Sequence, residues 1–192
     1  MDLTEGTIQQ KTARAKKNMM WFAMLSMLMT FAGLTSAYIV SAERKDWIDN
    51  FIFPSAFYLS LGVLILSSLC FYFFKKSIKQ DNRNLATIYM IGTFISAVAF
   101  IILQFSGFSE IIAQGFYPTG SAATVTTSFI YAIVFVHLLH IFGGLIVLLV
   151  VLVKHLKGKY TKENYLGVEL AGMYWHFVDL LWVYLFGFLL FM

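Results

Sequence analysis

The chain has 192 residues, of which 59% are apolar and only 12% are charged. Soluble domains carry about a quarter charged residues, so this composition excludes an ordinary soluble enzyme or binding module. The single cysteine, Cys70, excludes an internal disulfide and a pair of cysteine metal ligands. The net charge of +4 does not indicate nucleic-acid binding, because the basic residues lie in short groups beside long apolar stretches.

Five apolar stretches are each long enough to cross the hydrocarbon core of a bilayer, which takes about 20 residues. In chain order, we expect transmembrane helices at about 19–40, 51–74, 85–108, 125–153 and 170–191. The first stretch is too long for the roughly 7–15-residue core of a signal peptide, so we interpret it as a retained helix. Residues 1–18 are expected to form a cytoplasmic tail and residues 19–192 a single membrane domain. The predicted fold class is all-α, an integral membrane bundle of five transmembrane helices.

The basic residues predict how this bundle is oriented. They gather before the first predicted helix, after the second and after the fourth, in three groups: Lys11, Arg14, Lys16 and Lys17; Lys75, Lys76, Lys79 and Arg83; and Lys154, Lys157, Lys159 and Lys162. Between the first two helices lie only Arg44 and Lys45. Because cytoplasmic loops of membrane proteins are enriched in Lys and Arg, we expect the N-terminus in the cytoplasm and the C-terminus outside.

Ionisable residues in the membrane are concentrated in the last two predicted helices. The fourth carries His137 and His140, and the fifth carries Glu169, His176 and Asp179. Such residues are costly in hydrocarbon and usually face the interior of a bundle. At about 100° per residue, each set falls on one face of its helix. We therefore expect the two helices to face each other and share a polar patch, in which His176 and Asp179 form a local hydrogen bond.

Two chemical interpretations of this patch are disfavoured by the spacing. His137 and His140 are three residues apart, unlike the histidines of H-E-x-x-H, and the Glu-x-x-His of di-iron bundles does not occur. Haem ligation by two histidines stays open. A proton relay needs polar groups beyond Asp179, and the following LLWVYLFGFLLFM offers no such chain of groups. The sequence thus favours a structural hydrogen-bonded network or a lipid site.

Two motifs carry a resemblance to a known family. AGMYWHFVDLLWVYLF in the fifth helix resembles the C-terminal signature of subunit III of the haem–copper terminal oxidases. IYAIVFVHLLHIFGGLIVLL resembles the penultimate helix of that family, with its H-x-x-H-x-x-G-G pattern. Weaker matches follow the same order in FAGLTSAYIV, FPSAFYLSLGVLILSS and ILQFSGF. The resemblance covers nearly all of the chain after residue 19.

The resemblance implies subunit III of a bacterial haem–copper terminal oxidase, a cytochrome c oxidase of aerobic electron transport in the cytoplasmic (inner) membrane. The parent complex reduces oxygen to water and pumps protons. No catalytic, cofactor-binding or metal-binding residue is implied in this chain, because haem and copper belong to partner subunits. The implied partners are the catalytic subunit I, subunit II and membrane phospholipid. The chain is expected to stabilise subunit I, bind phospholipid and support proton uptake.

By position, five residues match the buried polar set of the family and are interpreted as packing and lipid-cleft residues: His137, His140, Glu169, His176 and Asp179. Longer members have seven helices, the first two forming one arm of a V-shaped cleft. This chain aligns from the third, so its cleft is expected to be open, shallower or closed by a partner. A glutamate that follows serine in longer members is Met27 here, so no role of that glutamate transfers.

Three alternatives remain open from the sequence. Five-helix members of the family also occur among quinol oxidases and among the accessory proteins of nitric oxide reductases. A small transporter with a substrate site at His140 and Asp179 is an alternative of another class. Transporters often contain inverted repeats and broken helices, and five spans do not divide into two equal halves.

Overall fold

The computed structural model describes residues 7–48, 51–120 and 123–192. Five helices account for most of these residues: α1 (Ile8–Val40), α2 (Ser55–Lys79), α3 (Arg83–Ala113), α4 (Val125–Leu156) and α5 (Leu166–Phe191). A short 3₁₀ turn, Ser41–Glu43, continues α1. All five helices are long and apolar enough to cross a membrane. The prediction of an all-α, five-helix membrane protein is confirmed.

The first helix begins much earlier than the apolar pattern indicates. It begins at Ile8 rather than near residue 19, so the described part of the expected tail is almost entirely helical, while residues 1–6 lie outside the described ranges. Thr7 starts it with a capping box: its hydroxyl accepts from the Gln10 N–H at 3.4 Å, and the Gln10 side chain accepts from the Thr7 N–H at 3.1 Å. These bonds satisfy backbone donors that a helix start leaves open. The helix therefore includes the basic segment before residue 19, which hydropathy does not mark as helical.

Three of the membrane helices end in the same way. A residue with positive φ follows the end of each of α2, α3 and α4, namely Asp81 (φ 58°), Gly115 (φ 87°) and Gly158 (φ 69°). After Gly158, the Lys159 N–H turns back to the Lys154 carbonyl oxygen at 3.0 Å. This Schellman geometry satisfies carbonyl groups at the helix end, where the chain leaves the membrane.

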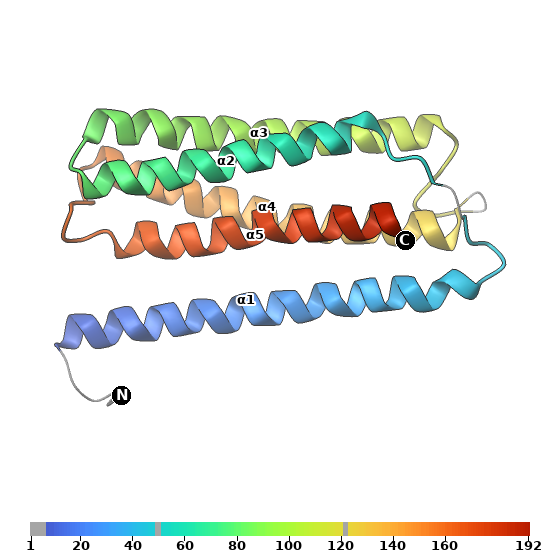
Figure 1. Cartoon of the computed structure of the whole chain (residues 1–192), viewed down its shortest axis with the longest axis horizontal. Coiled ribbons are helices and arrows are strands. Elements are labelled where there is room, and N and C mark those ends of the chain that lie inside the picture. The colour runs from blue at the N-terminus through green and yellow to red at the C-terminus, as the bar shows by residue number, and fades with distance from the viewer. Residues whose placement is uncertain (1–6, 49–50, 121–122) are drawn as a thin grey trace.

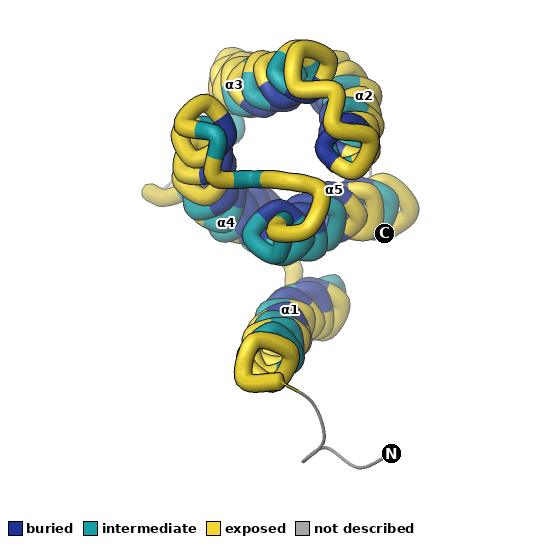
Figure 2. Tube along the Cα trace, turned by 90° about the vertical axis from the view of Figure 1, so that its left-hand side faces the viewer, coloured by how far each residue is buried: buried dark blue, intermediate teal, exposed yellow. Residues whose placement is uncertain are grey.

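Helices α2, α3, α4 and α5 form a ring, and α1 lies outside it (Figure 2). α2 packs along α3, α3 also contacts α4, and α5 closes the ring by contacting both α4 and α2. As far as the chain is described, α1 packs only on α4 and α5 among the long helices. α5 is therefore the one helix that contacts α1, α2 and α4.

The two ends of the bundle differ in charge, as the sequence predicted. The start of α1, the α2–α3 turn and the α4–α5 connection, which carry the three basic groups, all lie at the left end of Figure 1. The C-terminus lies at the opposite end. By the positive-inside rule, we expect the basic end to be cytoplasmic.

At the opposite end, the connection between α1 and α2 is fastened to the start of α4. The Asp46 carboxylate accepts a hydrogen bond from the Val125 N–H at 3.3 Å, and the Thr126 hydroxyl accepts one from the Ile48 N–H at 2.9 Å. The Arg44 guanidinium donates to Asp46 at 3.1 Å and holds the pKa of that carboxyl below its ordinary value. A carboxylate at a helix N-terminus is favourable, so this contact helps to hold α1 beside α4.

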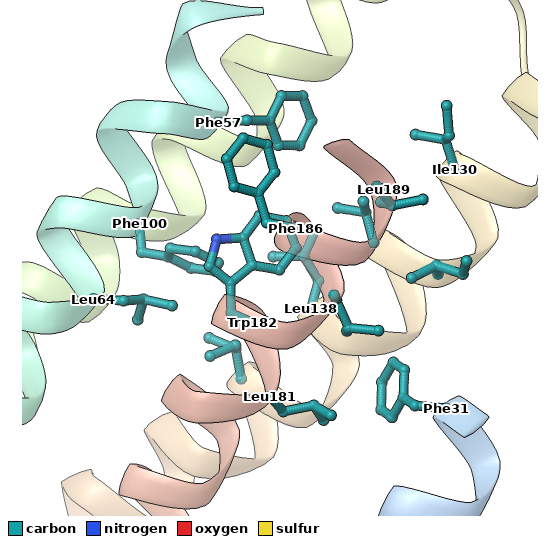
Figure 3. Close-up of a cluster of buried hydrophobic side chains, with 14 of the residues drawn as sticks. Phe31, Phe57, Leu64, Phe100, Ile130, Leu138, Leu181, Trp182, Phe186 and Leu189 are labelled. Carbon is teal, nitrogen blue, oxygen red and sulfur yellow. The ribbon is translucent and has the colours of Figure 1, made fainter. Parts of the chain in front are cut away.

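Aromatic side chains fill the centre of the ring around Trp182 of α5 (Figure 3). The Trp182 ring stacks with Phe57 of α2 at a centroid distance of 6.1 Å and meets the edge of Phe100 of α3 at 5.4 Å. Phe186, one turn further along α5, also stacks on Trp182. Since lipid is as apolar as these side chains, the contacts stabilise the bundle by close packing rather than by escape from water.

A second tryptophan of α5 requires a glycine on α4. Trp175 is buried, and its indole N–H donates to the Ser67 hydroxyl of α2 at 3.1 Å. A Cβ added at Gly144 would lie 2.8 Å from the Trp175 ring. The hydrogen bond to Ser67 holds the ring in place, so a side chain at Gly144 has to displace α4 or α5.

Replacing Gly144 with alanine is therefore expected to destabilise the bundle. Overpacking of this kind costs about 1–3 kcal/mol, more than alanine gains in helix propensity. Gly62→Ala on α2 is the matched control, because within the described ranges no atom beyond its chain neighbours and its own helix backbone lies within 4 Å of the added Cβ. Thermal unfolding of the purified variants in mild detergent measures the difference. Equal midpoints for Gly144→Ala and Gly62→Ala would contradict the close approach of α4 and α5.

Candidate functional site

The polar residues of α4 and α5 occupy separate environments. His137 lies in the aromatic centre of the ring, and His140 lies near Phe31 of α1. Glu169 pairs with α1, while His176 and Asp179 lie beside α2. The prediction of one shared polar patch is wrong, because α5 has neighbours on three sides and its polar residues are distributed among them.

His137 is completely buried among aromatic rings. Its imidazole stacks on Trp182 at a centroid distance of 5.0 Å, with the edges of Phe100 and Phe31 at 5.9 and 6.3 Å. Within the described ranges, no hydrogen-bond partner reaches either of its ring nitrogens or the Trp182 indole nitrogen. At this position the side chain packs as a flat ring, and the hydrogen-bonded network expected for the patch is not formed.

His140 is satisfied within its own helix. Its Nδ1 donates to the Val136 carbonyl oxygen at 2.7 Å, one turn earlier in α4. The Tyr174 hydroxyl of α5 donates to the His140 carbonyl oxygen at 2.8 Å, so α4 and α5 are joined through the backbone of this residue. The imidazole ring itself lies 5.5 Å from the Phe31 ring of α1.

Glu169 joins the start of α5 to α1, the helix outside the ring. Its carboxylate lies 2.6 Å from the Lys17 ammonium of α1, and both side chains are partly exposed. An ion pair of this exposure contributes about 0–1 kcal/mol. The ion pair therefore orients α1 against α5 more than it contributes to the stability of the fold.

His176 turns toward α2 rather than toward Asp179. Its Nδ1 lies 2.6 Å from the Ser68 hydroxyl oxygen, a hydrogen bond between α5 and α2. Both Asp179 carboxylate oxygens are buried and have no hydrogen-bond partner among the described residues. The predicted bond between His176 and Asp179 is therefore not formed, because packing against α2 offers the imidazole the Ser68 hydroxyl.

Ser68, His176 and Asp179 lie along a groove between α2 and α5, called here the α2–α5 groove. A cavity of about 520 Å³ forms its central part, between Leu64, Ser68 and Tyr72 of α2 and His176, Asp179 and Leu180 of α5. A second cavity of about 400 Å³ also borders Tyr72 and His176 and continues to Lys75, Lys76 and Lys79. The groove thus runs from an apolar centre to a basic cytoplasmic end.

Three further polar residues hold helices together, and sequence analysis named only Arg83 among them, as one of the basic residues that predict orientation. His155, at the end of α4, is buried and its Nε2 lies 2.9 Å from the Thr87 hydroxyl of α3. Gln104 of α3 is buried and donates to the Ser60 hydroxyl of α2 at 2.9 Å. Arg83 donates to two carbonyls at the end of α4, both at 3.1 Å. The sequence offers a signal for Gln104, whose amide stands alone among apolar residues in ILQFSGF.

Within the described ranges, no three His, Cys, Asp or Glu residues lie close enough together to hold a metal ion.

Comparison with known proteins identifies the family. The family model described as "Cytochrome c oxidase subunit III" matches residues 4–192. The chain belongs to this family. The cytochrome bo(3) ubiquinol oxidase subunit 3 of Buchnera aphidicola (subsp. Acyrthosiphon pisum) is 30% identical over 172 residues, which cover 88% of this chain and 82% of the relative.

Two other relatives show how the match varies in extent. The corresponding subunit 3 of Pseudomonas aeruginosa is 26% identical over 170 residues, covering 86% of this chain and 79% of the relative. Cytochrome c oxidase subunit 3 of Rattus norvegicus is 33% identical over 131 residues, covering 67% of this chain and 47% of the relative. The matched region therefore spans about half the length of that cytochrome c oxidase subunit.

The family membership gives the sequence motifs a structural meaning. As subunit III of a haem–copper oxidase, the chain is a multi-pass protein of the bacterial inner membrane. In HLLHIFGG of α4, His137 stacks on Trp182 and Gly144 gives room to Trp175. Both tryptophans belong to YWHFVDLLW of α5. The two subunit III motifs thus meet at the contact between α4 and α5.

Replacing His137 with phenylalanine tests whether it is a packing residue. The variant keeps an aromatic ring beside Trp182 and removes two nitrogens that have no hydrogen-bond partner among the described residues. We therefore expect equal or greater stability, by up to about 1–3 kcal/mol. His140→Phe is the comparison, because it removes the hydrogen bond to Val136 and is expected to lower the unfolding midpoint. Loss of folding or of haem from copurifying subunits in His137→Phe alone would show that the imidazole nitrogens bind a partner.

Proposed function

We propose that this chain is a non-catalytic subunit of a proton-pumping oxygen reductase, the cytochrome c oxidase of aerobic respiration. It stabilises the catalytic subunit I, with subunit II as a further partner, binds phospholipid and supports proton uptake. The match of the subunit III family to residues 4–192 is the observation that carries this proposal.

The chemistry of the interior supports a non-catalytic role. His137 is enclosed by carbon-rich rings, and His140 donates to its own helix. Both imidazoles lie beside Phe31, but His137 stacks on Trp182 while His140 donates to Val136. Among the described residues, neither belongs to a group that could hold a metal ion. Haem and copper would accordingly be held by partner subunits, and this chain would supply no ligand to either.

The exposed surface supports a role in assembly and lipid binding. Large apolar side chains are exposed on all five helices, as expected of a protein surrounded by lipid and by other membrane subunits. α1 stands outside the ring (Figure 2). Only 28% of the residues in its most apolar 18-residue stretch are buried within the chain. A helix so exposed along its length provides a surface for lipid or for a neighbouring subunit.

Ubiquinol oxidation by the parent complex is a second candidate. The ubiquinol oxidase relatives align along 82% and 79% of their own length, whereas the cytochrome c oxidase subunit of Rattus norvegicus aligns along 47%. This difference in extent favours a shared five-helix architecture with the ubiquinol enzymes. The small-transporter alternative is disfavoured, because His140 lies near α1 and Asp179 lies beside α2.

Affinity purification tests the proposal directly. The chain is tagged at its cytoplasmic N-terminus, extracted in mild detergent, and examined for reduced-haem bands and oxygen uptake. We expect both, with oxygen uptake supported by reduced cytochrome c. Uptake with ubiquinol instead would identify the second candidate, and reduction of nitric oxide instead of oxygen would identify a nitric oxide reductase accessory protein.

The control is a known multisubunit membrane complex followed through the same extraction. If that complex survives while this chain is recovered alone and colourless, the proposed assembly with an oxidase is wrong.

A further inference from the structure

Two cavities separate the start of α1 from the α4–α5 connection, at the basic end of the bundle (Figure 1). One, of about 660 Å³, lies between the first turns of α1 and Glu163, Asn164 and Leu166. The other, of about 470 Å³, also borders Asn164 and Leu166 and continues to Lys16 of α1. Because they share these residues, the two cavities form one continuous space, called here the α1 cleft.

The α1 side of this cleft is mostly polar and precedes the apolar stretch of the helix. It runs from Thr7 to Lys16, a rise of about 14 Å, whereas the apolar stretch begins near residue 19. Gln9, Gln10 and Thr12 border it. Amide and hydroxyl side chains both donate and accept hydrogen bonds, as a peptide backbone does. The cleft therefore suits a hydrophilic chain that lies outside the hydrocarbon.

Three lysines from three different segments border one end of the cleft. Lys16 belongs to α1, Lys154 to the last turn of α4 and Lys159 to the α4–α5 connection. The turn at Gly158 brings the chain back over the end of α4, where the Lys159 N–H donates to the Lys154 carbonyl oxygen at 3.0 Å. The backbone thus holds these two lysines close together, facing the start of α1.

These three positive charges are not balanced by carboxylates of the described residues. The ion pairs in the described part of the chain involve Lys17 and Arg44, and none of the three lysines takes part in one. Among the described residues that border the cleft, Glu163 alone is acidic, and it borders the other cavity. Charges arranged in this way attract a partner of opposite sign and fix its orientation.

We propose that the α1 cleft binds an acidic cytoplasmic segment of a neighbouring subunit of the oxidase. Aspartate or glutamate side chains of that segment lie against Lys16, Lys154 and Lys159, and its backbone continues along α1 toward Thr7. This inference rests on the proposed function and adds to the assembly a contact outside the membrane. A phospholipid is a poorer occupant, because its acyl chains need hydrocarbon and the α1 side of the cleft is mostly polar.

Carbodiimide crosslinking of the assembled complex tests the contact, because the reagent joins a lysine amine directly to a carboxylate. The tagged complex is purified in mild detergent and treated, and mass spectrometry locates the links. We expect at least two of Lys16, Lys154 and Lys159 to be joined to one acidic segment of a neighbouring subunit. The link between Lys17 and Glu169, whose charged atoms lie 2.6 Å apart, is the internal control that the reagent reaches this end of the chain.

Charge variants measure what the lysines contribute to assembly. The complex is washed at the salt concentration that releases half of the unmodified chain from the haem-containing subunits. The variant Lys16→Gln, Lys154→Gln, Lys159→Gln is expected to lower the retained fraction by at least about threefold, because its exposed ion pairs with the partner are lost. The variant Lys16→Arg, Lys154→Arg, Lys159→Arg keeps the charge and is expected to be retained like the unmodified chain.

The matched control is Lys11→Gln, Lys157→Gln, Lys162→Gln. It removes the same charge from the same three parts of the chain, at lysines that do not line the cleft. We expect it to be retained like the unmodified chain, which would separate a defined contact from a general effect of net charge.

Three results would overturn the inference: a Lys17–Glu169 link without any link from the cleft to another subunit, links only to a second copy of this chain, or equal retention of the two glutamine variants. In the first case, phosphatidylglycerol lost from the cleft variant alone would identify a lipid as the occupant. Haem content and oxygen uptake are recorded before the salt wash. If both are present, such a result shows only the docking site to be wrong, whereas recovery of the chain without haem or oxidase activity would show that the proposed function is wrong.

Discussion

Every peptide group in the hydrocarbon of a bilayer must find its hydrogen-bond partner inside the protein, and the form of this chain follows from that constraint. Five long helices satisfy their backbone groups internally. At the ends, where this pattern stops, local devices take over: a capping box at Thr7, Schellman turns after three helices, and Arg83 beneath the last carbonyls of α4. Because helices need no further backbone partners, side-chain packing alone decides how they are arranged.

Packing then makes α5 the centre of the molecule. Trp182 joins the aromatic side chains of the ring, and Trp175 fits against Gly144 while bonding to Ser67. The residues that carry the family resemblance are thus largely the residues that hold α4 and α5 together. The proposed supporting role requires a fixed shape, and this contact provides one.

The sequence predicted the helices well and the relations between them poorly. Hydropathy is a property of single segments, so it located the five spans. The basic groups lie together at one end of the bundle, while the orientation in the membrane stays a prediction. It missed the start of α1, because a cap and a basic helix have no apolar signal. It also predicted a His176–Asp179 bond that is replaced by one from His176 to Ser68, 108 positions away in the chain. Helical spacing shows which residues share a face, but it does not show which neighbour that face meets.

The most direct test of a non-catalytic role is a balance of haem and copper after the complex is dissociated. Harsher detergent releases this chain, and haem and copper are then measured in the released chain and in the remaining subunits, together with oxygen reduction by each. We expect all of the haem and copper, and the initial oxygen reduction, to stay with the remaining subunits, and the released chain to be colourless. Haem or copper that follows this chain, or oxygen reduction by the chain alone, would contradict a purely supporting role.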